Sequence, residues 1–467
     1  MITVENKTFD EIFISESQSI KRVLNKDDIV LFGVMSGDVN PTHFDEEGEA
    51  GRAHRVVGHG MWSASLISAL LGNYLPGAGT VYRSQQLDFL RPVELGDELT
   101  VSVTVTAKDP ADHSVELACL AVNQRGERVL GGVASVIAPT EKRRYEQHAL
   151  PELKPHRSHQ IFETLIERCK GMEPVSMAVC HPCDEASLAG PIAAAEEGLI
   201  EPVLVGPRAK IEAVAAGLGI DVGKYRIVES EHSADSAAKA VALCRNGETA
   251  GLMKGSLHTD EMMHAVAQRD LGLRTGRRIS HVFVMDVPAY PRMLMVTDAA
   301  INIYPALEDK VDILQNAIDL AHVLGVEQPK VAILSAVETV YPKITSTLEA
   351  AALCKMADRG QITGALLEGP LAFDNAISEE AARIKKIVSP VAGRADILLV
   401  PDLEAGNMLA KQLSYLADAE AAGIVLGARV PIVLTSRADS ARARLASCAV
   451  AVLHARGQVR QTGLAAE

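Results

Sequence analysis

The chain has few aromatic residues, an odd number of cysteines and no excess of positive charge. Aromatics make up 4% of the 467 residues, with a single Trp, while alanine is abundant. This composition favours packed helices and α/β layers over an all-β chain. The seven cysteines fit reduced thiols rather than a disulfide framework, which predicts a cytoplasmic protein. The formal net charge of −14 argues against a nucleic-acid partner and against binding to an anionic membrane surface.

Several other sequence signals are missing. We find no apolar N-terminal run of the signal-peptide kind and no uncharged stretch of about 18 residues that could span a bilayer. No G-x-G-x-x-G follows an expected strand and no Walker A motif is present, which argues against a dinucleotide or ATP site. Cys180 and Cys183 have metal-like spacing, but no second cluster would complete a zinc site. We therefore expect structural thiols there and no bound metal.

Residues 36–43, SGDVNPTH, are the strongest candidate for chemistry in the first part of the chain. Pro41 keeps Asn40 out of the helical region, so the chain must turn, and the turn can aim Asp38 and His43 at one point. A carboxylate and an imidazole aimed together can hold a water molecule, orient it and move its protons. The same spacing also fits a junction in which Asp38 caps the backbone and His43 only hydrogen-bonds to it.

The residues around this turn predict an α+β domain. Residues 19–35 have apolar side chains at helical spacing, and Asp27 and Asp28 mark the start of a short helix that ends at Gly37. The segment Met61–Leu71 is apolar on nearly all sides and predicts a buried helix. Period-two patterning then predicts four strands, at 81–90, 98–107, 114–123 and 127–137. This order suggests an antiparallel sheet wrapped around the helix.

Three ordered blocks within residues 10–138 resemble the MaoC-type (R)-specific enoyl-CoA hydratases of the hot-dog fold: SGDVNPTH, GHGM and GTVYRSQQLDFLRPVELGDELTVSVTV. The resemblance implies that Asp38 and His43 activate the water and that the N–H of Gly60 binds the thioester oxygen. A fixed N–H at a helix N-terminus suits the enolate oxygen that forms when water adds to an unsaturated thioester. Asn40 is placed with the substrate-binding residues, where it braces the turn, and His59 is expected to be structural.

The segment after this domain predicts a connector. Residues 139–157 are charged and contain three prolines, so they cannot make a packed core. We therefore expect a linker between a domain of residues 1–138 and a domain of residues 158–467. The basic cluster at 142–144 is expected to be a solvated run of charge.

Beyond the linker, short apolar strands alternate with amphipathic helices, which predicts α/β layering. Strands are expected at 175–180, 202–205, 225–228, 251–254, 279–286, 293–297, 330–334, 362–368, 397–400, 423–426 and 432–434. So many strands in two runs suggest two α/β lobes with a cleft between them.

A strand, a Thr-Ser-Arg sequence and a helix follow one another over residues 430–450. This layout aims backbone N–H groups, the Ser436 hydroxyl and the Arg437 guanidinium at one anion. An alternative interpretation is that Ser436 is only the N-cap of the helix and that Arg437 forms a surface ion pair.

Five ordered blocks in this half resemble the phosphate acetyl/butyryltransferase family: LMKGSLHTDE, RISHVFVMD, MVTDAAINIYP, EGPLAFDNAIS and GARVPIVLTSRADSARARLAS. The resemblance implies a two-lobed α/β transacylase domain. Residues 158–278 and 427–467 would form the first lobe, and residues 279–426 the second.

The family resemblance also implies acyl transfer between CoA and phosphate through a tetrahedral species whose oxyanion needs stabilising. Ser436 would lie near that oxyanion and Arg437 would bind phosphate. Lys254, Thr259 and Asp298 fall in matching blocks and are expected to be substrate-binding residues of the cleft.

Two positions depart from the acetyltransferase pattern. His264 stands where those members have an arginine, and Ala443 stands where they have a catalytic aspartate. Asp439 is the nearest carboxylate and would act as the base, or would only cap the helix. The SRADS sequence is shared with butyryl-type members, which favours that branch and a longer acyl chain.

Taken together, the two resemblances imply a bifunctional enzyme. One domain would hydrate trans-2-enoyl-CoA to (R)-3-hydroxyacyl-CoA, and the other would transfer acyl groups between CoA and phosphate. The expected partners are acyl-CoA and acyl phosphate, with no tightly bound cofactor, and the chain is expected to form a homo-oligomer. Two alternatives stay open: a C-terminal domain that only binds acyl-CoA and assembles the protein, favoured by His264 and Ala443, and a hot-dog domain that is a thioesterase.

Overall fold

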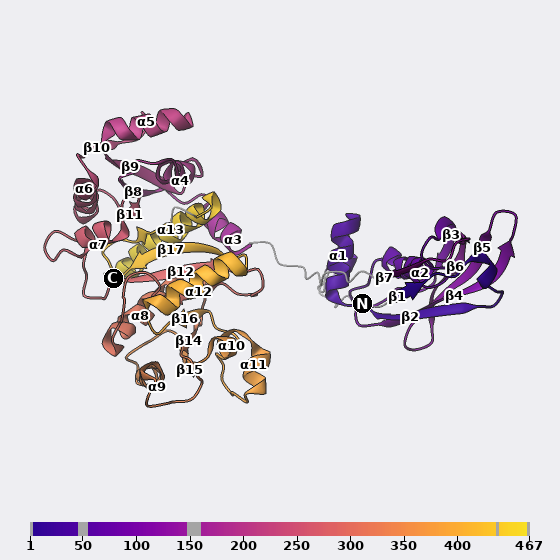
Figure 1. Cartoon of the computed structure of the whole chain (residues 1–467). Helices are drawn as coiled ribbons and strands as arrows, with labels where there is room; N and C mark the ends of the chain where they lie inside the picture. The colour runs from indigo at the N-terminus through magenta and orange to yellow at the C-terminus, as the bar shows by residue number, and fades with distance from the viewer. Residues whose placement is uncertain (1–2, 45–54, 147–159, 436–438, 465–467) are drawn as a thin grey trace. The chain divides into compact units, whose positions relative to one another are not determined.

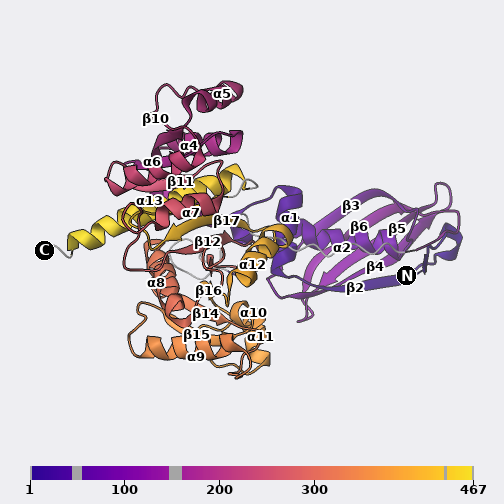
Figure 2. The same ribbon diagram turned by 60° about the vertical axis from the view of Figure 1, so that its left-hand side comes forward.

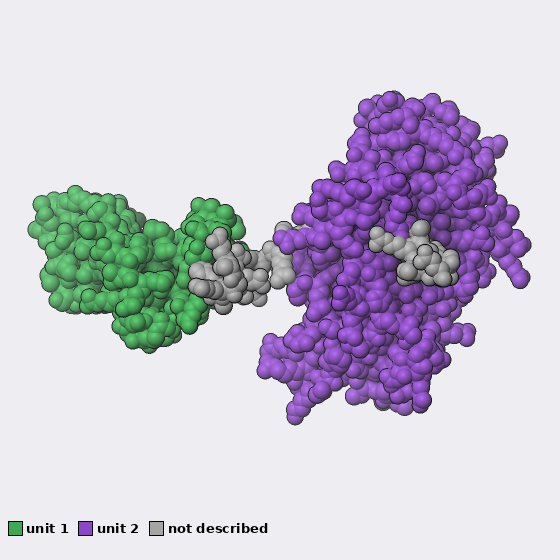
Figure 3. Space-filling view, turned by 180° about the vertical axis from the view of Figure 1, so that it is seen from behind, with its two compact units in different colours: residues 1–155 green, residues 156–467 purple. Residues whose placement is uncertain are grey.

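The chain divides into two compact units, residues 1–155 and 156–467 (Figures 1 and 3). The computed structural model describes residues 3–44, 55–146, 160–435 and 439–464, and the side chains as far as Gly457. The boundary between the units falls inside the predicted linker. Among the described residues, none of the helices combines the length and the apolarity needed to cross a lipid bilayer.

The first unit is an antiparallel sheet with a helix packed on it. The helix is α2 (Gly60–Asn73), and the strands are β2 (Ser17–Val23), β3 (Val81–Phe89), β4 (Glu98–Asp109), β5 (Ser114–Val122) and β6 (Arg128–Ile137). Their order in the sheet is β2-β4-β5-β6-β3, and Figure 2 shows α2 lying across it. Buried and less buried residues alternate along β4, so that one face of the sheet meets the apolar side of α2. The predicted hot-dog arrangement of helix and meander is confirmed.

The segment before the turn differs in part from the prediction. Helix α1 (Lys26–Ser36) forms where Asp27 and Asp28 predicted it, and Gly37 ends it with a left-handed φ of 76°. Residues 17–23, however, pair with β4 as strand β2 instead of extending the helix. Pairing with β4 therefore overrides the local helical spacing of the apolar residues.

Part of the predicted linker belongs to the first unit. Strand β7 (Arg144–Glu146) pairs antiparallel with β1 (Thr3–Glu5), and Lys142 forms an ion pair with Glu11 at 2.8 Å. The basic cluster at 142–144 therefore meets acidic residues of the N-terminal segment rather than solvent alone. The expected linker of residues 139–157 is thus too long at its start, and residues 147–159 lie outside the described part of the chain.

The second unit is built on one eleven-stranded sheet. Its strands are β8 (Val175–Cys180), β9 (Ile200–Gly206), β10 (Ile227–Glu229), β11 (Gly251–Lys254), β12 (Ser280–Asp286), β13 (Leu294–Thr297), β14 (Lys330–Leu334), β15 (Leu366–Leu371), β16 (Ile397–Leu399), β17 (Glu420–Leu426) and β18 (Ile432–Val433). Each expected strand has a counterpart here. The order is β10-β9-β8-β11-β18-β17-β12-β13-β16-β14-β15, and Figure 1 shows the sheet running from β10 to β15.

The two expected lobes occupy the two halves of this sheet. Strands of the first lobe end at β18, which pairs with β17, the last strand of the second lobe. Most pairs within each half are parallel, whereas β12 and β17 run antiparallel to their neighbours. The strands near the middle are buried along nearly their whole length, as expected for a sheet covered by helices on both faces.

Helices cover the sheet of the second unit. They are α3 (Gln160–Cys169), α4 (Glu185–Glu196), α5 (Arg208–Leu218), α6 (Ser233–Arg245), α7 (Thr259–Ala267), α8 (Leu307–Val323), α9 (Thr345–Asp358), α10 (Phe373–Ile377), α11 (Glu379–Ile384), α12 (Leu403–Leu416) and α13 (Ala441–Leu464). The longest, α13, continues beyond the predicted end of the last helix at residue 450.

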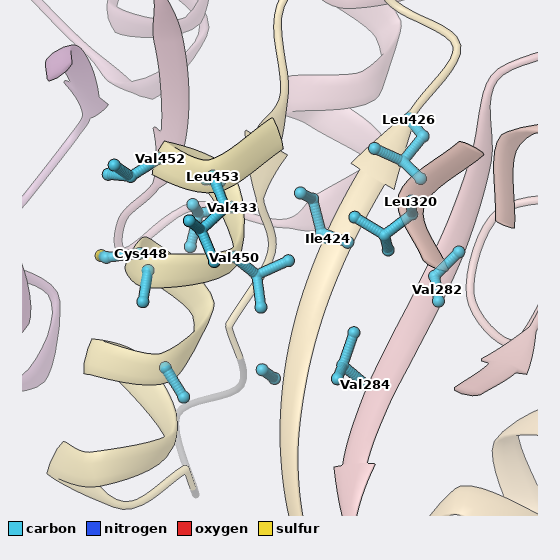
Figure 4. Close-up of a cluster of buried hydrophobic side chains, with 14 of the residues drawn as sticks. Val282, Val284, Leu320, Ile424, Leu426, Val433, Cys448, Val450, Val452 and Leu453 are labelled. Carbon is cyan, nitrogen blue, oxygen red and sulfur yellow. The ribbon is translucent and has the colours of Figure 1, made fainter. Parts of the chain in front are cut away.

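One hydrophobic core joins the two lobes (Figure 4). Helix α13 and strand β18 of the first lobe pack against β12, β17 and α8 of the second. The side chains labelled there are Val282, Val284, Leu320, Ile424, Leu426, Val433, Cys448, Val450, Val452 and Leu453. Because these side chains are almost completely buried, the lobes share part of their stabilisation.

Candidate active sites

The turn at residues 36–43 brings the predicted aspartate and histidine together. A short 3-10 helix, Pro41–His43, follows Asn40, whose Oδ1 accepts hydrogen bonds from the backbone N and the hydroxyl of Thr42 at 3.2 and 3.0 Å. The backbone N–H of Asn40 in turn donates to Asp38 Oδ1 at 3.3 Å. Asn40 therefore braces the turn that carries both candidate catalytic side chains.

His43 faces Asp38 with one ring nitrogen and is anchored by the other. Its Nε2 lies 3.9 Å from Asp38 Oδ2, and its Nδ1 lies 2.8 Å from the carbonyl oxygen of Val57. Since a carbonyl oxygen only accepts hydrogen bonds, Nδ1 carries the proton of the neutral ring and Nε2 is left as an acceptor. The Asp38 side chain is 52% exposed and that of His43 is 13% exposed, so the pair is open to a water molecule or a ligand.

His59 contacts both Asp38 and His43. Its ring stacks on that of His43, with centroids 3.8 Å apart, and Phe32 lies on the ring at 5.1 Å. The Nε2 of His59 donates to the Asp38 carbonyl oxygen at 3.0 Å, and the residue is only 2% exposed. His59 is expected to be structural, and it contacts both members of the pair through the His43 ring and the Asp38 backbone carbonyl.

Gly60 begins helix α2 directly after His59. Within the described residues, no side chain caps the N-terminus of α2. Gly60, with Gly58 and Ser63, lines a cavity of about 270 Å³ whose remaining walls come from residues 89–93 and 129–130. A β-carbon at Gly60 would lie 3.3 Å from the Phe89 ring. The positive end of the α2 dipole therefore faces a cavity, as an oxyanion would require.

Asp38, His43 and His59 also place potential metal ligands within 4.8 Å of one another. The His59 Nε2, however, already donates to the Asp38 carbonyl, and the two stacked rings lie at only 30° to each other. Lone pairs in the planes of stacked rings do not converge on one ion as tetrahedral coordination requires. This arrangement suits the positioning of a water molecule better than the binding of a metal.

The cysteine pair of the second unit is poorly suited to metal or redox chemistry. Burial raises the pKa of Cys183 to about 11 and also raises the pKa of Cys180. Because the thiolate is the form that binds metals and attacks disulfides, both side chains are unreactive near neutral pH.

The predicted transferase residues of the first lobe lie at the end of β11. Lys254 is its last residue, with Nζ 3.3 Å from the Gly255 carbonyl oxygen, and Thr259 is the first residue of α7. Strand β11 pairs with β18, after which the chain reaches Ser436 and Arg437. These two predicted catalytic residues lie outside the described part of the chain.

Asp298, the predicted substrate-binding residue of the second lobe, is buried in a loop. It follows β13, the fourth strand along the sheet from β11, and is 2% exposed. Its carboxylate accepts hydrogen bonds from the backbone N–H groups of Ala300 and Ile301 at 2.9 and 3.0 Å and from Asn302 Nδ2 at 2.6 Å. Burial raises its pKa, although these donors oppose the shift. These hydrogen bonds hold the carboxylate against its own loop, since the spacing lets one carboxylate reach successive N–H groups. Substrate binding by Asp298 stays a prediction.

At the start of α13, the helix cap is not Asp439, one of the two roles that the sequence allowed for this residue. Ser440 Oγ accepts from the backbone N–H of Ala443 at 3.1 Å, so Ser440 rather than Asp439 caps the helix. Asp439 and Ala443 line a cavity together with Glu420, the first residue of β17. The sequence around Glu420 gave no sign that this residue would lie beside the proposed transferase segment, because only the folded sheet brings β17 next to the start of α13. His264 is exposed on α7, in a groove formed with α6.

Two family models match the chain. The model described as phosphate acetyl/butaryl transferase matches residues 229–452, and the model described as MaoC like domain matches residues 14–122. The chain is 67% identical to a phosphate acetyltransferase of Rhizobium meliloti over 294 residues, which cover 63% of this chain and 93% of that protein. It is 42% identical to a phosphate butyryltransferase of Clostridium acetobutylicum over 292 residues, covering 62% of this chain and 97% of that protein.

A solved structure supports the same assignment. A branched-chain phosphotransacylase from Enterococcus faecalis V583 matches with a TM-score of 0.53 and 29% sequence identity, covering 60% of this chain and 99% of that one. These matches fall on the eleven-stranded unit, while the MaoC-like match falls on the helix and sheet of the first. The chain therefore belongs to the phosphate acetyl/butyryltransferase family and carries a MaoC-like domain of the hot-dog fold ahead of its transferase domain.

Proposed function

We propose that the chain is a bifunctional acyl-CoA enzyme that hydrates trans-2-enoyl-CoA to (R)-3-hydroxyacyl-CoA in its first unit and exchanges acyl groups between CoA and phosphate in its second. The observation that carries the hydratase proposal is the approach of Asp38 Oδ2 to within 3.9 Å of His43 Nε2, with the other ring nitrogen of His43 held by the Val57 carbonyl. The matched transferase family supports the second activity.

In the proposed hydration, a water molecule lies between Asp38 and His43. The His43 Nε2 takes one proton from the water as its oxygen bonds to C3 of the substrate. The π electrons move to C2 and the thioester oxygen, and the N–H of Gly60 stabilises the resulting enolate. The Asp38–His43 pair then returns a proton to C2, so that one water is added overall.

The hydratase proposal is tested by following crotonyl-CoA with the full chain. Asp38→Asn and His43→Ala should each lower kcat by about 10²–10⁴, the usual contribution of a general acid or base. Asp27→Asn, at the opposite and exposed end of α1, is the matched control and should keep wild-type turnover. Near-normal turnover by either of the first two variants would remove them from the mechanism. Release of free thiol from saturated acyl-CoA without phosphate would instead identify a thioesterase.

In the proposed transfer, the CoA thiolate attacks the carbonyl of an acyl phosphate and phosphate leaves, or the same steps run in reverse. Arg437 would bind the phosphate, with Ser436 beside the oxyanion and Lys254 and Thr259 in the same site. Asp439, which does not cap α13, is the candidate base that takes the thiol proton. CoA thioesters and phosphate are thus proposed as substrates, with no tightly bound cofactor.

A second candidate function for the transferase domain is acyl-CoA binding without turnover. The buried and apolar Ala443 favours it, because it supplies no acidic group in the first turn of α13. The two candidates are separated by measuring CoA release from butyryl-CoA with phosphate. Turnover that Arg437→Ala abolishes supports the transferase, while tight acyl-CoA binding with no turnover supports the binding module.

A further inference from the structure

A cavity of about 320 Å³ opens beside the first turn of α13 in the transferase domain. Three elements besides α13 wall it: helix α12, the start of β17 and one residue of β12. Its apolar lining is Phe283, Ala410, Ala419, Ala421 and Ala443. Of these, Ala410, Ala419 and Ala443 are each less than 10% exposed, so small buried methyl groups form part of the lining. The remaining residues of α12 that line the cavity are Asn407, Lys411, Ser414 and Tyr415.

The cavity adjoins the segment in which the transferase chemistry is proposed. Asp439 lines it and follows Ser436 by three residues. Three residues span at most about 11 Å between Cα atoms, so chain connectivity keeps Asp439 within that span of the proposed catalytic serine. This limit follows from chain connectivity alone.

Hydrogen bonds and ion pairs fix the wall formed by α13. Ser440 Oγ donates to Glu420 Oε1 at 3.5 Å, and Arg442 Nε lies 3.4 Å from Glu420 Oε2. Arg442 also donates to Glu163 of α3 at 2.7 Å. The first turn of α13 is thereby held to β17 and α3. Glu420, Asp439 and Ser440 supply polar groups to the cavity, with Ser440 bonded to Glu420, and the alanines supply apolar lining.

We propose that this cavity holds the acyl chain of the transferase substrate and that Ala443 sets the chain length that fits. The inference rests on the proposed acyl transfer. A volume of about 320 Å³ is far larger than the methyl of an acetyl group requires. The matching substrates are acyl groups with three or more carbons, linear or branched, whose carbonyl lies beside the polar groups of Glu420, Asp439 and Ser440. A side chain larger than methyl at residue 443 would fill the space that these carbons need.

The test compares butyryl-CoA with acetyl-CoA in phosphate-dependent CoA release by the full chain. In Ala443→Leu, the ratio of kcat/KM for butyryl-CoA to that for acetyl-CoA should fall by at least about tenfold, since one methylene in an apolar pocket is worth at least that much. Ala441→Leu is the matched control, because Ala441 is exposed in the same helical turn and does not line the cavity. It should leave the ratio unchanged.

Because Ala443 is buried, its replacement by Leu could unfold the protein, so the same cavity is also tested from other walls. Ala410→Leu approaches the cavity from α12 and should lower the same ratio, while Phe283→Ala should raise the ratio for hexanoyl-CoA over butyryl-CoA. An unchanged ratio in folded Ala443→Leu and Ala410→Leu, as judged by circular dichroism, overturns the inference. Equal losses for both substrates also overturn it, since they would assign the cavity to the CoA part of the ligand. Absence of phosphate-dependent turnover in the wild type would instead reject the proposed transferase function itself.

Discussion

At the residue scale, the candidate hydratase pair depends on His59 for its position. The ring of His59 lies against His43, and its Nε2 holds the Asp38 carbonyl. His59→Phe keeps an aromatic ring under His43 but removes the hydrogen bond. We expect kcat for crotonyl-CoA hydration to fall about fivefold, because a neutral hydrogen bond contributes about 1 kcal/mol.

A kinetic comparison separates this positioning role from a purely structural one. For His59→Phe, kcat should fall while KM for crotonyl-CoA and the thermal midpoint change little. His59→Ala also removes the stacked ring and should lose more turnover than His59→Phe. If both variants keep wild-type kcat, or if KM alone rises, His59 does not position the pair.

A buried histidine of the transferase domain makes stability depend on pH. His281 is completely buried, and this burial lowers its pKa to about 3. Within the described residues, neither ring nitrogen has a hydrogen-bond partner. Between about pH 6.5 and pH 3 the unfolded chain binds a proton here that the folded chain does not. This contribution to stability is therefore present above pH 6.5 and is lost as the pH falls, by about 2 kcal/mol between pH 6.5 and pH 5.

Replacement of this histidine should flatten the acid limb of the stability curve. His281→Leu is expected to lower the slope of unfolding free energy against pH by about one proton over this range, measured by urea denaturation. His258→Leu, at an exposed position, serves as the control and should keep the wild-type slope. Equal slopes for the wild type and His281→Leu would contradict the assignment of this dependence to His281.

At the scale of single elements, the C-terminal end of α1 determines the direction in which the chain leaves the helix, and so where Asp38 lies. Gly37 ends the helix with φ at 76°, and a β-carbon there would meet nothing within 4 Å. The cost of Gly37→Ala is therefore conformational rather than steric, about 1–2 kcal/mol for a left-handed alanine. We expect Gly37→Ala to destabilise the first unit by this amount in urea denaturation and to lower hydration by displacing Asp38.

Asparagine provides the matched comparison at this position. Because Asn adopts left-handed angles more readily than Ala, Gly37→Asn should lose less stability and less hydratase activity than Gly37→Ala. If the two variants behave alike, the positive φ at residue 37 is not what positions Asp38.

At the scale of the whole molecule, each unit has its own hydrophobic core. Leu70 on α2 is completely buried in the core of the first unit, and Ile424 on β17 is completely buried in the second. Leu70→Ala should destabilise the first unit by about 2–5 kcal/mol because it leaves a cavity. Hydration of crotonyl-CoA should then fail at a lower temperature, while phosphate-dependent CoA release keeps its wild-type thermal midpoint.

The reciprocal variant completes this experiment. Ile424→Ala should lower the thermal midpoint of CoA release and leave that of hydration unchanged. If either substitution lowers both midpoints together, the units unfold as one cooperative body and not as two.

Much of this fold could be predicted because its elements follow from local patterns. The apolar run of residues 61–71, the strand alternation after it and the eleven short apolar strands of the second half each predicted an element that the structure contains. Strand β2 could not be predicted in this way, since its apolar spacing also fits a helix and only pairing with β4 decides between the two. The β1–β7 pair was also missed, because its partners lie at opposite ends of the unit's sequence.

The amino-acid sequence alone determined the Asp38–His43 turn and the matches to two families, because a turn depends on the angles of neighbouring residues and a motif on their order. Only the tertiary structure decided the contacts of His59 with that pair, the hydrogen bonds that hold Asp298 to its loop and the placing of Glu420 beside α13. Each of these depends on contacts between distant segments or on the direction of a side chain, and the local spacing of residues predicts neither. A long-range contact forms when packing of the whole unit brings distant residues together, so no window of the sequence contains it.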